Sequence, residues 1–167
     1  MVNYRRNRVR GGTYFFTVTL RDRRSDLLVR EVDALRESWR TAAARTPHSV
    51  IAAVLLPDHL HAVLRMAEDT DDYPRLWQNI KKGFTRRVCA SGRPPWQPRY
   101  WERTIHGEAQ LQTCVDYVHI NPVKHGWVAR VADWPHSSFH RHVRMGLLPA
   151  DWAGNASVSD QGFGERR

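Results

Sequence analysis

Runs of β-branched, aromatic or apolar residues alternate along this chain with segments in which apolar residues recur every three or four positions, which predicts strands alternating with helices. Residues 13–20 are β-branched and aromatic, as is typical of a strand. The apolar run 50–56 predicts a second strand, and the turn-like pair Pro57-Asp58 predicts that a third strand follows it antiparallel. Residues 99–105 predict a fourth strand.

Helices are predicted where apolar residues recur every three or four positions, namely over 25–45, 73–90, 108–120 and, as a short helix, 137–145. Because a proline disfavours helical backbone at the preceding residue, Pro122 predicts that the third helix ends at about Asn121. The order of elements predicts an α+β fold. We expect a ferredoxin-like βαββαβ core, whose antiparallel sheet carries helices on one face, plus a C-terminal helical extension.

The chain has no internal repeat, and its 167 residues are enough to bury a substantial core. We therefore expect one domain over residues 1–153, with a basic N-terminal arm. Residues 154–167 are rich in Gly, Ser, Asn and charge, which predicts a flexible tail. This tail is a candidate to screen a binding cleft in the absence of ligand.

The charge of the chain limits the classes of function to consider. It has 26 Lys and Arg against 17 Asp and Glu, which gives a formal net charge of +9. Such an excess is typical of proteins that bind nucleic acid or another anionic surface. The longest uncharged apolar run is far too short to span a membrane, and the basic N-terminus lacks the apolar core of a secretory signal. We expect a cytoplasmic protein without a membrane segment. Cys89 and Cys114 lie too far apart for a Cys-x-x-Cys pair and are expected to pack as thiols.

Three basic regions are candidates for DNA contact. The arm before the first strand is either a solvated tail or a phosphate-binding segment, and its position favours the second. The helix over 73–90 carries basic residues with no acid between 75 and 99, which favours phosphate over a merely solvated face. In the next loop aromatic and basic residues interleave, as in proteins that stack single-stranded bases, although such aromatics can also cap a core. The candidates are Arg5, Arg6, Arg8, Arg10, Lys81, Lys82, Arg86, Arg87, Trp96 and Arg99.

Two histidines, His59 and His61, are separated by a single apolar residue at the start of the predicted third strand. Side chains alternate along a strand, so both imidazoles project from one face while Leu60 points into the core. Neutral imidazole is a common metal ligand, which makes the pair a candidate metal site. Most isolated His-x-His pairs are surface or core histidines, so the pair needs a second element to support it.

That second element lies in the helix over 108–120, where Tyr117 and Asn121 are four residues apart and share a helix face. With these features in place, the sequence resembles the REP-associated tyrosine transposases, relatives of the single-tyrosine insertion-sequence transposases of the HUH class. The resemblance extends over most of the chain. Its marks are Asn3-Tyr4-Arg5-Arg6, Gly11-Gly12-Thr13-Tyr14-Phe15-Phe16-Thr17-Val18, Leu56-Pro57-Asp58-His59-Leu60-His61, Tyr100-Trp101-Glu102, Tyr117-Val118-His119-Ile120-Asn121-Pro122-Val123-Lys124-His125-Gly126 and Trp134-Pro135-His136-Ser137-Ser138.

The resemblance implies a role for each matched residue. His59 and His61 would ligate a divalent cation, Mg or Mn, and Asn121 stands where relatives place a third ligand, usually Gln. Tyr117 would attack a phosphodiester of single-stranded DNA and leave a 5′-phosphotyrosine and a free 3′-hydroxyl. The implied substrate is the DNA hairpin of a repetitive extragenic palindrome, which carries a short conserved tetranucleotide on its 5′ side. The residues past Val128 fit the longer C-terminal part of the monomeric members.

Two other functions remain open. A domesticated protein that grips DNA hairpins without cutting them would use the same arginines and aromatics. A zinc hydrolase or deaminase is disfavoured, because the chain lacks a nearby Cys-x-x-Cys or His-x-x-x-His to complete a tetrahedral site. The acceptor of the Tyr117 proton is also open, with Asp116, His119 and His125 nearby in sequence.

Overall fold

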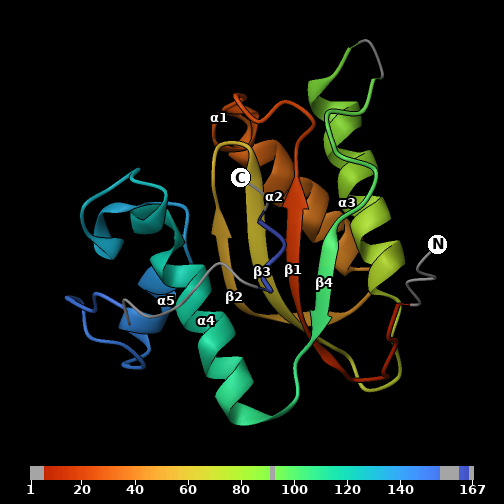
Figure 1. The fold of residues 1–167 in the computed structure, drawn as a ribbon. Coiled ribbons are helices and arrows are strands. Elements are labelled where there is room, and N and C mark those ends of the chain that lie inside the picture. The colour runs from red at the N-terminus through yellow and green to blue at the C-terminus, as the bar shows by residue number, and fades with distance from the viewer. Residues whose placement is uncertain (1–5, 91–92, 155–161, 166–167) are drawn as a thin grey trace.

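The computed structural model describes residues 6–90, 93–154 and 162–165, and its centre is a four-stranded antiparallel sheet (Figure 1). The strand order is β2-β3-β1-β4. The elements are β1 Thr13–Thr19, α1 Leu27–Arg30, α2 Val32–Ala43, β2 His48–Leu55, β3 His59–Met66, α3 Tyr73–Val88, β4 Trp101–Thr104, α4 Gly107–Lys124, the short 3-10 helix Val131–Asp133 and α5 Phe139–Arg144. The predicted α+β fold with its antiparallel βαββαβ core is confirmed.

One face of the sheet packs against α2 and α3. β1 pairs with β3 from Thr13 opposite Arg65 to Thr19 opposite His59, so alternate residues of both strands share a face. Tyr14 and Phe16 of β1 are completely buried on this face. They meet the ring of Tyr73 on α3 at 4.6 and 5.3 Å between centroids. These aromatic contacts belong to an apolar core that is larger than the core on the opposite face of the sheet.

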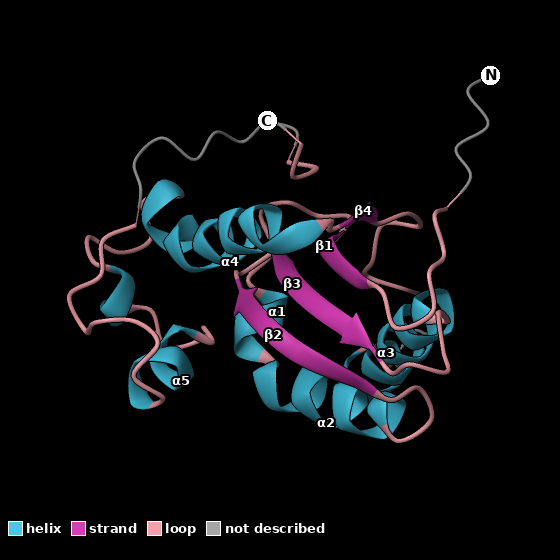
Figure 2. Cartoon of the chain, turned by 90° about the horizontal axis from the view of Figure 1, so that it is seen from below, coloured by secondary structure: helices cyan, strands magenta, loops and turns pink. Residues whose placement is uncertain are grey.

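The opposite face of the sheet is covered by α4. Figure 2 shows the strands between α4 on one side and α2 and α3 on the other. Phe15 of β1 and Val63 of β3 are buried here with Cys114, Val115 and Val118 of α4. Because His59 and His61 share the parity of Val63 along β3, they too project toward α4.

Two helices differ from the prediction. The expected helix over 25–45 is divided into α1 and α2, since Glu31 has φ −108° and ψ 34°, outside the helical region. The helix α4 continues past Asn121 and through Pro122 to Lys124. It ends in a Schellman motif, in which Gly126 has φ +72° and the Trp127 N–H donates to the Pro122 carbonyl at 3.0 Å.

The C-terminal extension covers the outer edge of β2. Residues 136–138 run beside this strand, and the Leu55 N–H donates to the His136 carbonyl at 2.9 Å. Farther along the edge, the Arg141 guanidinium of α5 donates to the Val50 carbonyl at 2.7 Å. Backbone groups that an edge strand would offer to another chain are therefore occupied. Among the described residues, no helix is long and apolar enough to cross a bilayer.

One buried histidine of α4 predicts a loss of stability in acid. His119 is fully buried and contacts the Ser138 hydroxyl at 2.9 Å, and burial lowers its pKa to about 3. Between that value and its ordinary pKa the unfolded chain binds the extra proton, so the folded state loses stability as pH falls below about 6.5. This histidine alone should cost about 2 kcal/mol of unfolding free energy between pH 7 and pH 5.

Urea unfolding at the two pH values measures the effect. The wild type should lose about 2 kcal/mol more on acidification than His119→Gln, whereas the exposed control His106→Gln should follow the wild type. An equal pH dependence in the wild type and His119→Gln would contradict this assignment.

Candidate functional site

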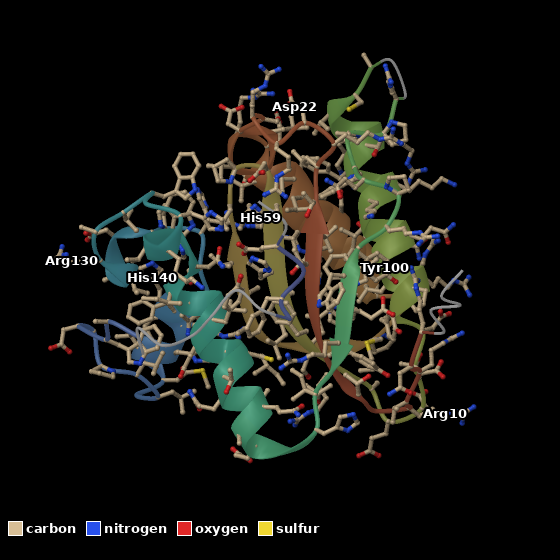
Figure 3. All side chains as sticks on the ribbon, in the orientation of Figure 1. Arg10, Asp22, His59, Tyr100, Arg130 and His140 are labelled. Atoms are coloured by element: carbon tan, nitrogen blue, oxygen red, sulfur yellow. The ribbon has the colours of Figure 1, made fainter. Side chains whose placement is uncertain are left out.

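The two histidines lie at the start of β3, directly after the turn that joins it to β2. Thr17 of β1 is opposite His61, and Val54 of β2 is opposite it on the other side, so His61 is in the interior of the sheet. Both histidines are almost completely buried. Figure 3 shows His59 on the sheet near the C-terminal end of α4. The predicted common face of His59 and His61 and the placement of Leu60 in the opposite core are confirmed.

Each histidine is held by its Nδ1 atom. His59 Nδ1 lies 2.8 Å from Asp58 Oδ1, and His61 Nδ1 lies 2.8 Å from the Thr17 hydroxyl. The two Nε2 atoms consequently point to the same place, toward one oxygen of Glu165, at 3.7 Å for His59 and 2.6 Å for His61.

The helix α4 brings Tyr117 and Asn121 to these histidines. The Tyr117 ring lies 5.3 Å from the His61 ring, centroid to centroid, and in edge contact with it. Asn121, one helical turn later, donates from Nδ2 to the Glu165 carboxylate at 3.0 Å. His125 follows at the end of the helix, with its ring 5.1 Å from that of His59. The structure thus brings two histidines of β3 together with three residues at the C-terminal end of α4, which is far from β3 along the chain.

The segment 162–165 forms a cover over the site. The sequence makes the whole tail a candidate to screen a cleft but singles out no residue in it. The Phe163 ring stacks on the Tyr117 ring at 3.7 Å with an angle of 6° between their planes. Glu165 Oε2 lies 3.1 Å from His125 Nε2, while Oε1 faces the histidine pair and Asn121. Figure 1 shows this segment in blue beside β1. A lone Phe and Glu in a polar stretch carry no periodic signal by which to find them.

The charges at the site are strongly coupled. Burial alone would raise the pKa of the Glu165 carboxyl, but its contacts with His125, His59 and His61 lower it far below the usual range. Burial lowers the pKa of His61 to about 4, which keeps its imidazole neutral near pH 7. Burial opposes the charge on Asp58 as well, yet the hydrogen bond with His59 and the nearby Arg23 hold the pKa of its carboxyl below the usual value.

The donor set fits a divalent cation. His59 Nε2 and Asn121 Oδ1 are buried and have no hydrogen-bond partner among the described residues, which is costly unless a ligand satisfies them. One ligand atom from each of His59, His125 and Glu165 lies within 4.8 Å of the others. Imidazole nitrogen with amide or carboxylate oxygen suits first-row divalent metals. Two of the candidate acceptors of the Tyr117 proton lie in different surroundings. His125 contacts Glu165 at the candidate metal site, whereas His119 contacts Ser138 of the C-terminal extension.

A second feature is a basic groove of about 940 Å³ between α3 and the loop before β4. Lys81 donates to the Gln97 carbonyl at 2.9 Å, with its ammonium 5.4 Å from the centre of the Tyr100 ring. Burial and the charge of Arg6 lower the pKa of Lys81 to about 8. The guanidinium of Arg6, which also lines the groove, lies 4.4 Å from the centre of the Tyr100 ring.

The predicted DNA-contacting residues are distributed unevenly about this groove. It is lined by Arg6, Lys81, Lys82, Arg86 and Trp96. Trp96 is 2 % exposed and packs on Phe84, so its indole belongs to the floor. Arg10, Arg87 and Arg99 are exposed outside it, and Arg8 pairs with Asp71 at 2.7 Å. Arg5 lies outside the described residues.

Comparison with known proteins decides the family. No family model matches the chain. It is 46 % identical over 166 residues to the REP-associated tyrosine transposase of Escherichia coli K12, covering 99 % of this chain and 98 % of that protein. The chain belongs to the REP-associated tyrosine transposases.

Two further similarities agree with this family. A Haemophilus influenzae protein described under the same family name is 36 % identical over 174 residues, which cover 97 % of this chain and 99 % of the relative. The solved structure of a REP-associated tyrosine transposase bound to a REP hairpin superposes with a TM-score of 0.94 at 46 % identity, over 100 % of this transposase and 99 % of that chain. The resemblance drawn from the sequence motifs is confirmed.

The cover in this transposase depends on a glycine that touches Trp101. Gly164 has φ +74°, and a Cβ added there would lie 2.3 Å from the Trp101 ring. Gly164→Ala should therefore detach segment 162–165 and expose His61. Backbone strain of about 1–3 kcal/mol in addition to the clash predicts at least roughly tenfold faster modification of His61 by diethyl pyrocarbonate, measured by peptide mass spectrometry.

Gly146→Ala is the matched control, because Gly146 has a similar φ of +70° with nothing within 4 Å of an added Cβ. It should leave the modification rate of His61 unchanged. Equal rates in Gly164→Ala and the wild type would show that His61 is protected by something other than the segment.

Proposed function

We propose that this transposase cleaves and rejoins single-stranded DNA at REP-type hairpins, with Tyr117 as the nucleophile. The observation that carries the proposal is the edge contact of Tyr117 with His61, 5.3 Å between ring centres, beside the convergent Nε2 atoms of the two histidines. The phenol oxygen would form a bond to the scissile phosphorus as the bond to the 3′-oxygen breaks. The products would be a 5′-phosphotyrosine and, after protonation, a free 3′-hydroxyl.

His59, His61 and Asn121 would hold the divalent cation, Mg or Mn. Such an ion, when bound, withdraws charge from a nonbridging phosphate oxygen and fixes the orientation of the phosphate. The protein's own contribution is placement. The sheet positions the two imidazoles, and one turn of α4 sets Asn121 next to them and Tyr117 beside His61.

The cover must leave before this reaction. Phe163 occupies one face of the Tyr117 ring, and Glu165 occupies the point on which the two histidines converge. A scissile phosphate is anionic, as is Glu165, so both would compete for the same nitrogens and cation. We infer that segment 162–165 and the DNA strand bind the site alternately.

The groove beside α3 would hold the DNA backbone. Lys82 and Arg86 stand exposed on its wall, one helical turn apart, and line the same groove as Tyr100. Arg6 connects the N-terminal arm to the groove through Tyr100. This combination of exposed cations with an aromatic ring suits single-stranded or hairpin DNA. The arm would contribute further contacts through Arg10.

The runner-up is a hairpin-binding protein that does not cut. The observation in its favour is that Tyr117 is completely buried under the cover. In that case the groove would retain its function, whereas the tyrosine would serve only to pack α4 against Phe15 and Phe163.

Tyr117→Phe separates the two functions. A labelled hairpin oligonucleotide with a single-stranded flank should form a covalent protein–DNA adduct with the wild type in Mn²⁺ or Mg²⁺, and none with EDTA. The variant should lose the adduct completely and still bind the hairpin, because only the nucleophilic oxygen is removed. Denaturing gel electrophoresis measures the adduct and a mobility shift measures binding. Tyr100→Phe, a phenol in the groove, should retain the adduct, and an adduct that persists in Tyr117→Phe would rule out this nucleophile.

The salt dependence of binding tests the groove. Removing two phosphate contacts with the double variant Lys82→Ala/Arg86→Ala should lower the slope of log K against log salt by about 2. Arg36→Ala/Arg40→Ala is the control, since these arginines have the same spacing on α2 but pair with Asp33 and Glu37. Fluorescence anisotropy of the hairpin between low and moderate salt gives both slopes. A slope unchanged from the wild type would place the DNA elsewhere.

A further inference from the structure

Outside the residues already assigned, an aspartate and an arginine stand behind the first histidine. We propose that Asp58 and Arg23 are positioning residues that fix the ring of His59, with Nε2 directed into the site and hydrogen on Nδ1. The inference rests on the proposed metal-dependent function, since its purpose is to present a lone pair to the cation. Neither residue carries a sequence signal for such a role.

The contacts form a directed chain. Arg23 Nε lies 2.7 Å from Asp58 Oδ2, and Asp58 Oδ1 lies 2.8 Å from His59 Nδ1. A carboxylate can only accept hydrogen bonds, so the proton between them belongs to Nδ1. The neutral ring then carries its lone pair on Nε2, the atom that faces the site and has no hydrogen-bond partner among the described residues. Asp58 thus selects one of two tautomers.

The main chain keeps Asp58 from adjusting. Its carbonyl accepts from the Leu20 N–H at 2.8 Å, which ties the turn to the end of β1. The Leu56 N–H donates to the His59 carbonyl at 2.9 Å and closes the turn. Asp58 is 8 % exposed, so its carboxylate would be costly to bury without its partners His59 and Arg23. Arg23 reaches it from the loop after β1 and leaves about half of its own side chain in solvent.

The second histidine has a different partner. His61 Nδ1 faces the neutral hydroxyl of Thr17, which also donates to the Phe163 carbonyl at 2.6 Å. A carboxylate partner raises the basicity of a ligating imidazole more than a hydroxyl does. His59 is therefore the stronger donor to a metal ion of the two histidines.

The loop after β1 provides matched controls. Asp22 and Arg24 form an ion pair of the same chemistry, 3.6 Å apart, with side chains 63 % and 93 % exposed. They flank Arg23 in sequence but make no contact with either histidine among the contacts of the described residues. Asp22→Ala and Arg24→Gln thus remove the same charges as Asp58→Ala and Arg23→Gln, at the two positions next to Arg23.

Two measurements on the full chain test the proposal. The first is Mn²⁺ affinity, read from the free-ion signal in electron paramagnetic resonance. Removing an outer-shell partner of a ligating histidine typically weakens metal binding about 10–100-fold, which is the loss expected for Asp58→Ala. Asp58→Asn keeps the acceptor oxygen without the charge and should lose less, as should Arg23→Gln. Both controls should bind like the wild type.

The second measurement is the tautomer of His59 in metal-free protein, read from ¹⁵N shifts of the imidazoles on the alkaline side of the His59 titration. Burial opposes the charge on this ring, but its contacts with Asp58 and Glu165 raise its pKa above the ordinary value. The wild type and Asp58→Asn should hold hydrogen on Nδ1 of His59, and Asp58→Ala should lose this preference with His61 unchanged. Unaltered Mn²⁺ affinity together with an unaltered His59 tautomer in Asp58→Ala would overturn the proposal. If that variant fails to fold, an Mn²⁺ affinity of Asp58→Asn and Arg23→Gln equal to that of the controls would overturn it.

These outcomes are distinct from a failure of the proposed function. If the wild type binds no Mn²⁺, the metal-dependent cleavage fails, while the tautomer still shows whether Asp58 orients His59. If Mn²⁺ binds and follows Asp58 but Tyr117→Phe retains its adduct, the positioning role stands and the nucleophile is wrong.

Discussion

The antiparallel pairing of β1 with β3 is the interaction on which the rest of the structure depends. Its register sets Thr17 opposite His61 and sends alternate residues of each strand to opposite faces. A slip of one residue would turn the histidines into the core against α2 and α3 and bring Leu60 to the site. The fully buried rings of Tyr14 and Phe16 oppose such a slip. Apolar packing on one face therefore fixes polar geometry on the other.

Much of the fold could be predicted because its signals are local. Runs of β-branched, aromatic and apolar residues identified the strands, and the alternation of side chains along a strand placed His59 and His61 on one face. The contact of these histidines with Tyr117 could not be predicted from local signals, since it depends on how α4 crosses the sheet. Periodicity gives the buried face of that helix but not its partner. This part of the site came from resemblance to a family and from no physical rule applied to the residues.

The differences from prediction have identifiable causes. Pro122 removes one hydrogen bond from α4 close to its end, a loss that the Schellman motif at Gly126 helps the helix tolerate. The tail was a candidate to screen the cleft, but the two residues that form the cover were missed for another reason. Phe163 and Glu165 lie in a stretch whose composition is typical of disorder, and only tertiary contacts give them a structure. The buried acid Asp58 was read as a turn residue, although its carboxylate faces inward.

The covered edge of β2 has a consequence for how the molecule works. Residues 136–138 and Arg141 occupy backbone groups through which a sheet could be continued into a second copy. The tyrosine, the histidines and the asparagine that meet at the site all belong to one polypeptide. Dilution cannot separate these parts, since a single chain supplies the tyrosine, the histidines and the asparagine together.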